Sequence, residues 1–412
     1  MTLTRLRRRV LKGFVVLAVL GVLAIGVLIG FLWLEHRSKL TLPTPTGSFP
    51  VGRAIQDWTD PVGLDTLAPV PGTKRELLVW IWYPAVAGQS VVMDDYVPAR
   101  LRQNTRASGR TNIWTLLTRD ASNVRGHSAR DPDVSPHERS YPVVIMRGGA
   151  SSEVLNYSTL AEDLASHGYV VVGFDAPYRT GRVEFPDGRA MGRMEQNNPE
   201  RCVVPDRAQM ERCVGRVMTA WTGDIAFVLE RLALLNASDS SGKFTGRLDM
   251  SRVGVFGHSL GGAVAAQFCH EDSRCTAGID IDGAPHGSVI QAGLSQPFMF
   301  LLSDHGDASD SESIQALNDI QSIYDRIPRD RRVRLAIRGS FHFTFSDDGA
   351  LLKSRIVRGV LRMLGKLGID GRRQLAVTTY CLHVFFDRYL KGAGGSRLRI
   401  ASPLYPEIQV LE

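Results

Sequence analysis

Residues 253–263, Val-Gly-Val-Phe-Gly-His-Ser-Leu-Gly-Gly-Ala, constrain the fold of this chain more than any other segment. Apolar residues typical of a strand lead into the serine, and small residues typical of a helix follow it, so Ser259 is predicted to lie on a sharp strand-to-helix turn. Gly257 and Gly261, two positions before and after the serine, leave room for the strained backbone that such a turn requires. The arrangement is typical of a nucleophile elbow, although a tight structural turn would use the same glycines.

Strands and helices alternate on both sides of this turn. Short apolar runs predict strands at 75–84, 141–146, 169–174, 276–281, 297–302 and 333–337, and helical periodicity predicts helices at 157–167, 210–235, 351–367 and 375–390. This alternation predicts an α/β fold with one predominantly parallel sheet covered by helices on both faces. The 44% hydrophobic content of the 412 residues is ample for such a core.

The N-terminus predicts a membrane anchor. Residues 13–34 contain no charge, and a helix of this length matches a hydrocarbon core about 30 Å thick. More basic residues precede this stretch than follow it, so we expect residues 1–12 to stay in the cytoplasm and the rest to lie outside, giving a single-pass protein of the cell membrane. A cleaved signal peptide is the alternative, but its apolar region is normally about 7–15 residues long, which favours an uncleaved helix.

The remaining chain is predicted to form a stalk and one large domain. Residues 35–72 are rich in proline and glycine, which is typical of an extended stalk or linker. Residues 73–412 are predicted to form the folded domain, with insertions at about 85–140 and 178–205 that break the strand and helix pattern. We expect these insertions to cover or border the functional site.

The charge distribution argues against nucleic-acid binding. The formal charge is +7, but seven basic residues and one acidic residue within the first 40 positions account for +6 of it. The rest of the chain therefore carries only +1, too little for the basic face that a nucleic-acid partner requires.

Five cysteines are consistent with an oxidising compartment. Cys202 with Cys213 and Cys269 with Cys275 would each close a short loop, which leaves Cys381 free within an apolar helix. A metal site that uses Cys269, His270 and Cys275 is the alternative, but no fourth ligand with suitable spacing lies nearby, so disulfides are favoured and no metal is expected.

A serine nucleophile needs a base, and His342 is the natural candidate. It follows the predicted strand 333–337, in the chain order serine, acid, histidine that fits an elbow of this kind. His286 and His305 are the fallback candidates, whereas His258 is expected to face away because of its place in the elbow.

The acid that orients the base is less constrained by spacing. Asp282 follows one predicted strand, and Asp304 and Asp307 follow the next, so any of the three could be the partner of the histidine. Asp280 lies within a strand on the same face as Asp282 and is expected to be a buried, hydrogen-bonded residue.

Acyl transfer also needs N–H donors for an oxyanion. The backbone N–H groups of Leu260, directly after the serine, and of Gly149, after an early strand, occupy suitable positions. The sequence contains no phosphate-binding loop, dinucleotide fingerprint or zinc-protease helix, so no cofactor is implied.

Four segments together carry a family resemblance: residues 141–148, the run Tyr-Ser-x-x-x-x-Asp-Leu-Ala-Ser-His-Gly at 157–168, the elbow, and residues 339–342. Over roughly residues 75–390 the chain resembles the type II platelet-activating-factor acetylhydrolase family of α/β hydrolases. The resemblance implies that the acid is Asp282, which lies at the family's spacing after the nucleophile. It also implies hydrolysis of short or oxidised acyl chains of phospholipids, or of similar small esters. One departure is Arg147-Gly148, where the family often has His-Gly.

These observations predict a membrane-anchored serine carboxylester hydrolase, with Ser259 as nucleophile, His342 as base and Asp282 as orienting acid. Its expected partners are a small-molecule or lipid ester and the membrane. One alternative is an esterase for polyester or cutin-like substrates, which would use a more open cleft. Another is a noncatalytic hydrolase-fold protein that binds a ligand at the membrane.

Overall fold

A computed structural model describes residues 2–88, 92–98, 101, 118–150, 152–202, 206–304, 310–352, 355–365, 367–393 and 400–411. At its centre lies a 12-stranded sheet with the order β1-β5-β2-β3-β7-β6-β10-β11-β12-β13-β14, in which β4 pairs with β5 at one edge. The strands are β1 Leu40–Thr41, β2 Val51–Leu64, β3 Lys74–Pro84, β4 Met93–Asp95, β5 Val124–Arg130, β6 Tyr141–Arg147, β7 Val170–Asp175, β10 Leu248–His258, β11 Ala277–Ile281, β12 Phe298–Leu302, β13 Arg332–Ile337 and β14 Ile408–Val410. A separate hairpin pairs β8 Arg182–Glu184 with β9 Ala190–Gly192.

The middle of the sheet is parallel, as the sequence predicts. Strands β7, β6, β10, β11, β12 and β13 are parallel to their neighbours within this group, whereas β3 and β14 pair antiparallel with its two outer strands and β2 pairs antiparallel with β3. Because the carboxyl ends of parallel strands meet at one edge, the loops after β6, β10, β11, β12 and β13 all gather there.

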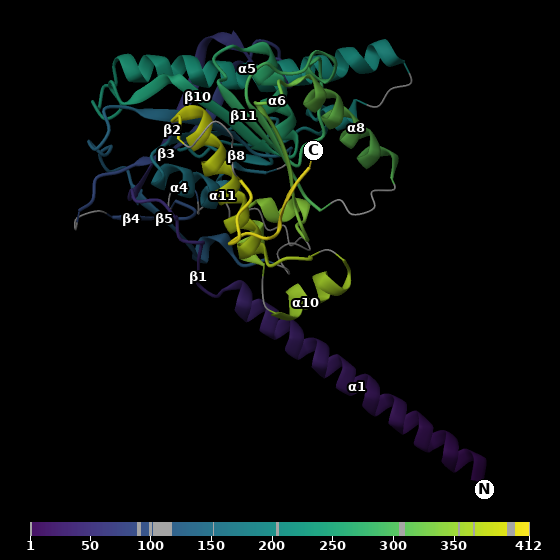
Figure 1. The fold of residues 1–412 in the computed structure, drawn as a ribbon. Helices are drawn as coiled ribbons and strands as arrows, with labels where there is room; N and C mark the ends of the chain where they lie inside the picture. The colour runs from purple at the N-terminus through teal and green to yellow at the C-terminus, as the bar shows by residue number, and fades with distance from the viewer. Residues whose placement is uncertain are drawn as a thin grey trace.

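Helices cover both faces of the sheet (Figure 1). Residues of α5 and α6 belong to one buried cluster and residues of α4 and α11 to the other, and alternate residues of β3 contribute to each. The helices are α1 Thr2–His36, α4 Ser158–Ser166, α5 Arg207–Ala237, α6 Leu260–Glu271, α7 Val289–Ala292, α8 Ser311–Arg326, α9 Asp348–Leu351, α10 Arg355–Met363 and α11 Gly371–Leu390. Short 3₁₀ helices are η2 Ala121–Asn123, η3 Val154–Tyr157, η4 Glu195–Asn197, η5 Pro199–Arg201 and η6 His342–Phe345. This layered architecture confirms the predicted α/β fold.

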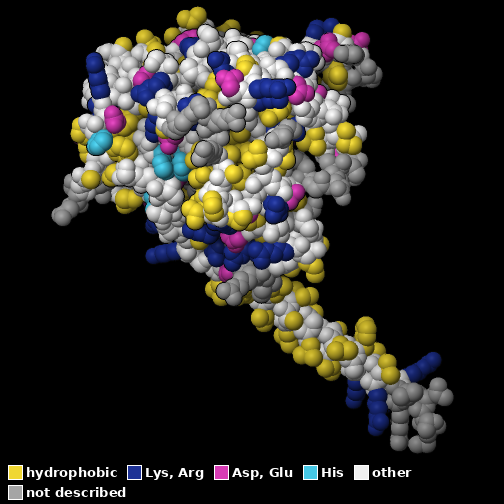
Figure 2. All heavy atoms as spheres, viewed as in Figure 1, with side chains coloured by type: hydrophobic (Ala, Val, Ile, Leu, Met, Phe, Trp, Pro, Cys, Tyr) yellow, Lys and Arg dark blue, Asp and Glu magenta, His cyan; other side chains and the backbone are white. Residues whose placement is uncertain are grey.

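The N-terminal helix α1 extends away from the folded body (Figure 1). Figure 2 shows hydrophobic side chains along its length and basic ones near its free end. The helical segment Arg7–His36 is 30 residues long, and its most apolar 18-residue window has a mean hydropathy of 3.0 and is not buried against the body. The helix meets the domain at His36, whose Nδ1 lies 3.0 Å from the carbonyl oxygen of Thr118 and whose carbonyl accepts from the N–H of Asp120 at 2.8 Å. The chain therefore carries one N-terminal apolar helix that is long enough to be a membrane span or a signal sequence.

Residues 35–72 differ from the stalk that the sequence predicts. They contain β1 and the 14-residue strand β2, which pairs antiparallel with β3 along most of its length. The proline density was misleading because Pro50 precedes β2 and Pro61 lies where the β2–β3 register shifts, a position in which no ladder hydrogen bond is lost. The segment is therefore part of the folded domain.

The predicted insertions are only partly separate from the sheet. In 85–140, β4 and β5 pair with each other, and β5 also pairs with β1 and β2. Residues 102–117 of that insertion lie outside the described residues. In 178–205, the β8–β9 hairpin and the short helices η4 and η5 are described as far as Cys202.

The two predicted disulfides are present. Cys202 pairs with Cys213 and Cys269 pairs with Cys275, with Cα atoms 5.6 and 5.0 Å apart, while Cys381 is buried and unpaired within α11. Because the sulfur atoms of Cys269 and Cys275 are both used in a disulfide, the structure does not support the alternative metal site there.

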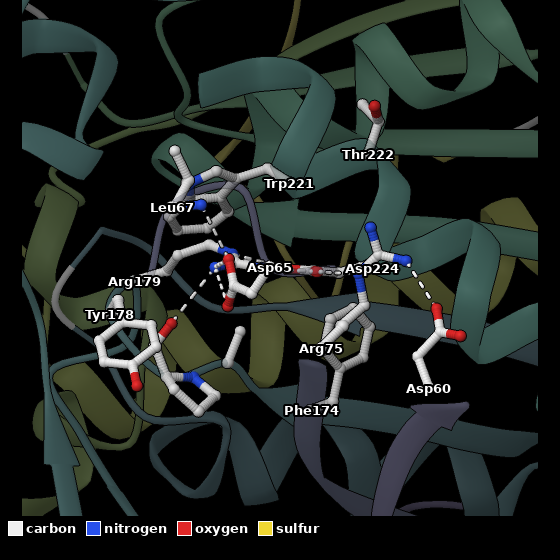
Figure 3. Close-up of polar contacts among 12 residues, drawn as sticks. Asp60, Asp65, Leu67, Arg75, Phe174, Tyr178, Arg179, Trp221, Thr222 and Asp224 are labelled. Atoms are coloured by element: carbon white, nitrogen blue, oxygen red, sulfur yellow. Dashed lines mark hydrogen bonds and ion pairs between the residues drawn. The ribbon is translucent and has the colours of Figure 1, made fainter. Parts of the chain in front are cut away.

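A buried ion-pair network fixes the loop that follows β7 (Figure 3). Arg179 donates to both oxygens of Asp65 at 2.9 Å and to both oxygens of Asp224 at 2.8 Å, and its side chain is 1% exposed. Arg75 extends the network from Asp224 to Asp60. Burial by itself would lower the pKa of Arg179, but contact with the two carboxylates outweighs burial and holds the pKa above its ordinary value. The network ties the segment before β3 to α5 and to the loop at the carboxyl edge of the sheet.

Candidate active site

The elbow forms as the sequence predicts. Strand β10 ends at His258, helix α6 begins at Leu260, and Ser259 between them has φ 57° and ψ −130°. A Cβ atom on Gly257 would lie 2.2 Å from the backbone of Gly261, and one on Gly261 would lie 2.4 Å from the carbonyl oxygen of Arg147. Both positions therefore require glycine, and the strained serine is held by close packing of backbone against backbone.

Asp282 and His342 are joined by a short hydrogen bond. Asp282 directly follows β11 and has φ 55°, and its Oδ2 lies 2.7 Å from Nδ1 of His342. Its other carboxylate oxygen accepts from the N–H of Ser303 at 2.7 Å. The carboxylate is 1% exposed at the side chain, whereas the imidazole is 48% exposed. When Nδ1–H donates to the carboxylate, Nε2 is left as the acceptor that a general base requires.

The surrounding contacts place this pair beside the elbow. The ring of His342 packs on the ring of His258, the residue before the serine, with centroids 4.5 Å apart. The N–H of Ser259 donates to the carbonyl of Ile281 at 2.8 Å, directly before Asp282. Serine, aspartate and histidine, which lie in three separate segments of the chain, thus meet at the carboxyl ends of β10, β11 and β13.

The other candidate residues have different surroundings. Asp304 accepts from the N–H of Gly339 at 2.6 Å, and Asp280 is fully buried and accepts from the N–H of Gly283 at 2.8 Å. Burial raises the pKa of Asp280 well above its ordinary value, in keeping with the buried, hydrogen-bonded residue that the sequence predicts. His286 lines a hollow together with Glu200 and Asp319. The candidates His305 and Asp307 lie outside the described residues.

The two predicted oxyanion donors lie on either side of the serine. Leu260 begins α6, so its N–H is among the first of the helix, which have no acceptor within the helix. Gly149 packs against the serine so closely that an added Cβ would be 3.1 Å from Cβ of Ser259. The N–H of Gly149 donates to the hydroxyl of Tyr157 at 3.3 Å, a long contact that an oxyanion would have to share or replace. The oxyanion role of Gly149 stays a prediction.

Tyr157 and His258 form a buried pair that the sequence does not reveal. The hydroxyl of Tyr157 lies 2.9 Å from Nδ1 of His258. Burial raises the pKa of Tyr157 to about 12, and burial beside His342 lowers the pKa of His258 to about 3. At neutral pH a protonated tyrosine therefore donates to a neutral imidazole. The expectation that His258 faces away was wrong, because its ring contacts His342; no local pattern identifies a contact between segments so far apart in the chain.

Arg147, the departure from the family pattern, points into the core. Its guanidinium lies between the rings of Phe174 and Trp221, at 4.3 and 4.6 Å from their centroids, and donates to the carbonyl of Phe174 at 2.8 Å. Burial lowers its pKa to about 10. Its side chain thus packs under α5, while its backbone carbonyl approaches Gly261 in the elbow.

Comparison with known proteins identifies the family. The family described as platelet-activating factor acetylhydrolase, isoform II, matches residues 34–179 and 223–392. The chain belongs to this family. The match begins before β1, so the segment expected to be a stalk lies within the family domain, whereas residues 180–222, with the β8–β9 hairpin, lie outside the match.

Relatives of this acetylhydrolase family share about a quarter of their residues with the chain. It is 26% identical to a probable 1-alkyl-2-acetylglycerophosphocholine esterase of Arthroderma benhamiae, over 91% of this chain and 95% of that protein. It is 27% identical to the platelet-activating factor acetylhydrolase of Cavia porcellus, over 61% of this chain and 58% of that protein. A solved ferulic acid esterase from Streptomyces cinnamoneus superposes with a TM-score of 0.71 at 26% identity, over 91% of this chain and all of that one. The chain is therefore a serine ester hydrolase with the α/β-hydrolase fold.

Proposed function

We propose that this acetylhydrolase-family member hydrolyses short-chain or phospholipid-type esters, using Ser259, His342 and Asp282. The observation that carries the proposal is the 2.7 Å hydrogen bond between Asp282 and His342 beside the strained serine of the elbow. The names of the Arthroderma benhamiae and Cavia porcellus relatives support a short acyl group on a glycerophospholipid.

The reaction proceeds through an acyl-enzyme. His342 Nε2 accepts the proton of the Ser259 hydroxyl as the oxygen attacks the ester carbonyl, and the N–H groups of Leu260 and Gly149 stabilise the oxyanion. The imidazolium then protonates the leaving alcohol. Water, deprotonated by the same histidine, releases the acid and restores the serine. Asp282 keeps the proton on Nδ1 throughout and stabilises the positive charge of the ring.

Helix α1 is proposed to anchor the enzyme in the membrane with the catalytic domain outside the cytoplasm. The apolar length of the helix and the basic residues at its free end support this orientation. The two disulfides of the domain fit an oxidising compartment. No cofactor and no nucleic acid take part in the proposed reaction.

Hydrolysis of a p-nitrophenyl ester series from acetate to palmitate tests the substrate class. The full-length chain, extracted from membranes with detergent, should be most active on acetate or butyrate and should prefer a 2-acetyl to a 2-palmitoyl glycerophosphocholine. A maximum at palmitate would contradict the short-chain proposal, and recovery of the intact chain in the soluble fraction would contradict the anchor.

Feruloyl esters are the second candidate substrate. The superposition with the ferulic acid esterase of Streptomyces cinnamoneus covers the whole of that chain, which supports this alternative. Methyl ferulate, assayed beside the acetyl ester and the acetylated phospholipid, separates the two: a kcat/KM at least tenfold higher on methyl ferulate would replace the acetyl-ester assignment.

Asp282→Asn should lower kcat about 10⁴-fold. The amide oxygen can still accept from the N–H of Ser303, but the amide NH₂ cannot accept from Nδ1–H of His342 and therefore favours the wrong tautomer. The measurement is kcat on p-nitrophenyl acetate, with circular dichroism as a check of folding.

Asp304→Asn is the matched control. The amide oxygen can keep the hydrogen bond from the N–H of Gly339, so kcat should change less than about tenfold. If Asp304→Asn were inactive and Asp282→Asn active, the acid would belong to the loop after β12.

A further inference from the structure

Asp163, His167 and His383 form a cluster of potential metal ligands away from the proposed catalytic residues. Asp163 lies in α4, His167 caps the carboxyl end of the same helix, and His383 lies in α11. One ligand atom from each residue lies within 4.8 Å of the other two. The first two belong to the run at 157–168 that carries the family resemblance, and the proposed reaction gives them no role.

The carboxylate of Asp163 has only one of its two oxygens hydrogen-bonded. Its Oδ1 accepts from both the N–H and the hydroxyl of Thr46 at 2.8 Å, which leaves Oδ2 facing the histidines. Oδ2 lies 3.6 Å from Nδ1 of His383 and 3.9 Å from Nε2 of His167. Among the described residues, neither Oδ2 nor Nδ1 of His383 makes a hydrogen bond, although both atoms are buried and Asp163 is only 2% exposed. At 3.6 Å the two atoms are within ion-pair distance but beyond hydrogen-bond distance, so an ion bound between them would satisfy both.

The other contacts of His167 show what an ion would have to replace. Its Nε2 lies 2.9 Å from the hydroxyl oxygen of Thr46, and its backbone carbonyl accepts from the ammonium group of Lys391. Lys391 is already paired with Asp387 at 3.0 Å, so it is not available to neutralise Asp163.

We propose that Asp163, His167 and His383 bind a divalent transition-metal ion such as Zn²⁺. Tetrahedral zinc with ligand bonds of about 2.0–2.1 Å places its ligand atoms about 3.3 Å apart, and Asp163 Oδ2 already lies 3.6 and 3.9 Å from the two imidazole nitrogens. The two rings now stack with centroids 4.1 Å apart, so binding requires the rings to turn until their in-plane lone pairs converge on one ion. His167 Nε2 then gives up its 2.9 Å contact with the hydroxyl of Thr46. The histidine side chains are 21% and 16% exposed, which leaves a path from solvent and room for a water ligand.

The donor set selects the type of ion and suggests its role. Two imidazoles and one carboxylate suit Zn²⁺, whereas Ca²⁺ and Mg²⁺ require mostly oxygen ligands. The ion would join the carboxyl end of α4 to the middle of α11, and through Asp163 also to Thr46 in the segment before β2. Its role is a structural clamp, independent of ester hydrolysis.

Equilibrium dialysis of the full-length chain, purified without a histidine tag and stripped with EDTA, tests the site. The chain should take up one Zn²⁺ with a rise in melting temperature, and should show no saturable binding of Ca²⁺ or Mg²⁺. His167→Ala and His383→Ala should each lower the zinc affinity at least tenfold. His137→Ala, which removes a side chain that is 72% exposed, should leave the affinity unchanged.

Two further measurements distinguish loss of the metal site from loss of folding and from failure of the proposed ester hydrolysis. Co²⁺ should give visible d–d absorption that both histidine variants lose, even if one variant is less stable than the parent chain. Ester hydrolysis should persist after EDTA treatment, so failure of the metal site and failure of the proposed function are distinguishable. No saturable zinc binding, or equal binding by the parent chain and both variants, would overturn the proposal.

Discussion

Ser259→Ala should lower kcat for ester hydrolysis by about 10⁵- to 10⁶-fold while the protein stays folded. The substitution removes the attacking oxygen, and neither His342 nor the oxyanion donors can replace it. Alanine keeps the Cβ atom that already fits at φ 57°, so the packing of the elbow should not change. The measurement is kcat on p-nitrophenyl acetate, with the melting temperature recorded in parallel.

Ser251→Ala is the matched control for this loss. Ser251 is an exposed residue of β10 whose hydroxyl donates to the nearby Asp249 at 2.5 Å, so its variant should keep full activity. A fluorophosphonate probe should label the parent chain and Ser251→Ala but not Ser259→Ala. Labelling of Ser259→Ala, or retention of its activity, would remove Ser259 as the nucleophile, and a folded parent chain that neither hydrolyses esters nor reacts with the probe would favour a binding protein.

Arg179→Met should lower the free energy of unfolding by about 3–5 kcal/mol. The side chain is 1% exposed, and its removal leaves Asp65 without its arginine and Asp224 with the longer 3.3 Å contact to Arg75 (Figure 3). Methionine has a similar length, so the loss reports uncompensated buried charge rather than a large cavity. Chemical denaturation of the full-length chain in detergent measures it, and the melting temperature should fall by several degrees.

Arg189→Met is the control that tests whether the loss of stability in Arg179→Met comes from burial of the ion pairs and not simply from removing an arginine. Arg189 also contacts two carboxylates, those of Glu76 and Asp187, but its side chain is 50% exposed and solvent screens its ion pairs. Its variant should therefore be close to the parent chain in stability. Equal stability of the Arg179 and Arg189 variants would show that the buried network does not hold the loop after β7.

Several features followed from local sequence because their causes are local. The glycines at 257 and 261 predicted the strained turn at Ser259, since backbone strain depends on residues within a few positions. The short loops between cysteines predicted both disulfides, and the uncharged run at 13–34 predicted the apolar helix. Alternating periodicity predicted the parallel middle of the sheet.

The placement of β2 shows where local patterns fail. Its flanking prolines and glycines resemble those of a linker, yet the strand is held by pairing with β3 rather than by its own composition. Strand pairing is a tertiary interaction that overrides weak local preference. The position of the Arg147 side chain also could not be predicted from local sequence. It points into the core because it packs on Phe174 and Trp221, which lie far from it in the chain.

Local sequence patterns were enough to predict the elbow, the apolar helix, the cysteine pairs and the α/β class, and to name Ser259 and His342 as candidates. Spacing alone did not distinguish Asp282, Asp304 and Asp307 as the acid that orients His342, and only the family resemblance favoured Asp282. The folded chain shows which carboxylate of the described candidates meets Nδ1 of His342. Strand ends that share one sheet edge have similar local sequences, and the paths of their loops determine which side chains meet. The tertiary structure alone also brought His383 to within reach of Asp163, since the two lie in distant parts of the chain and only the packing of α11 on α4 joins them.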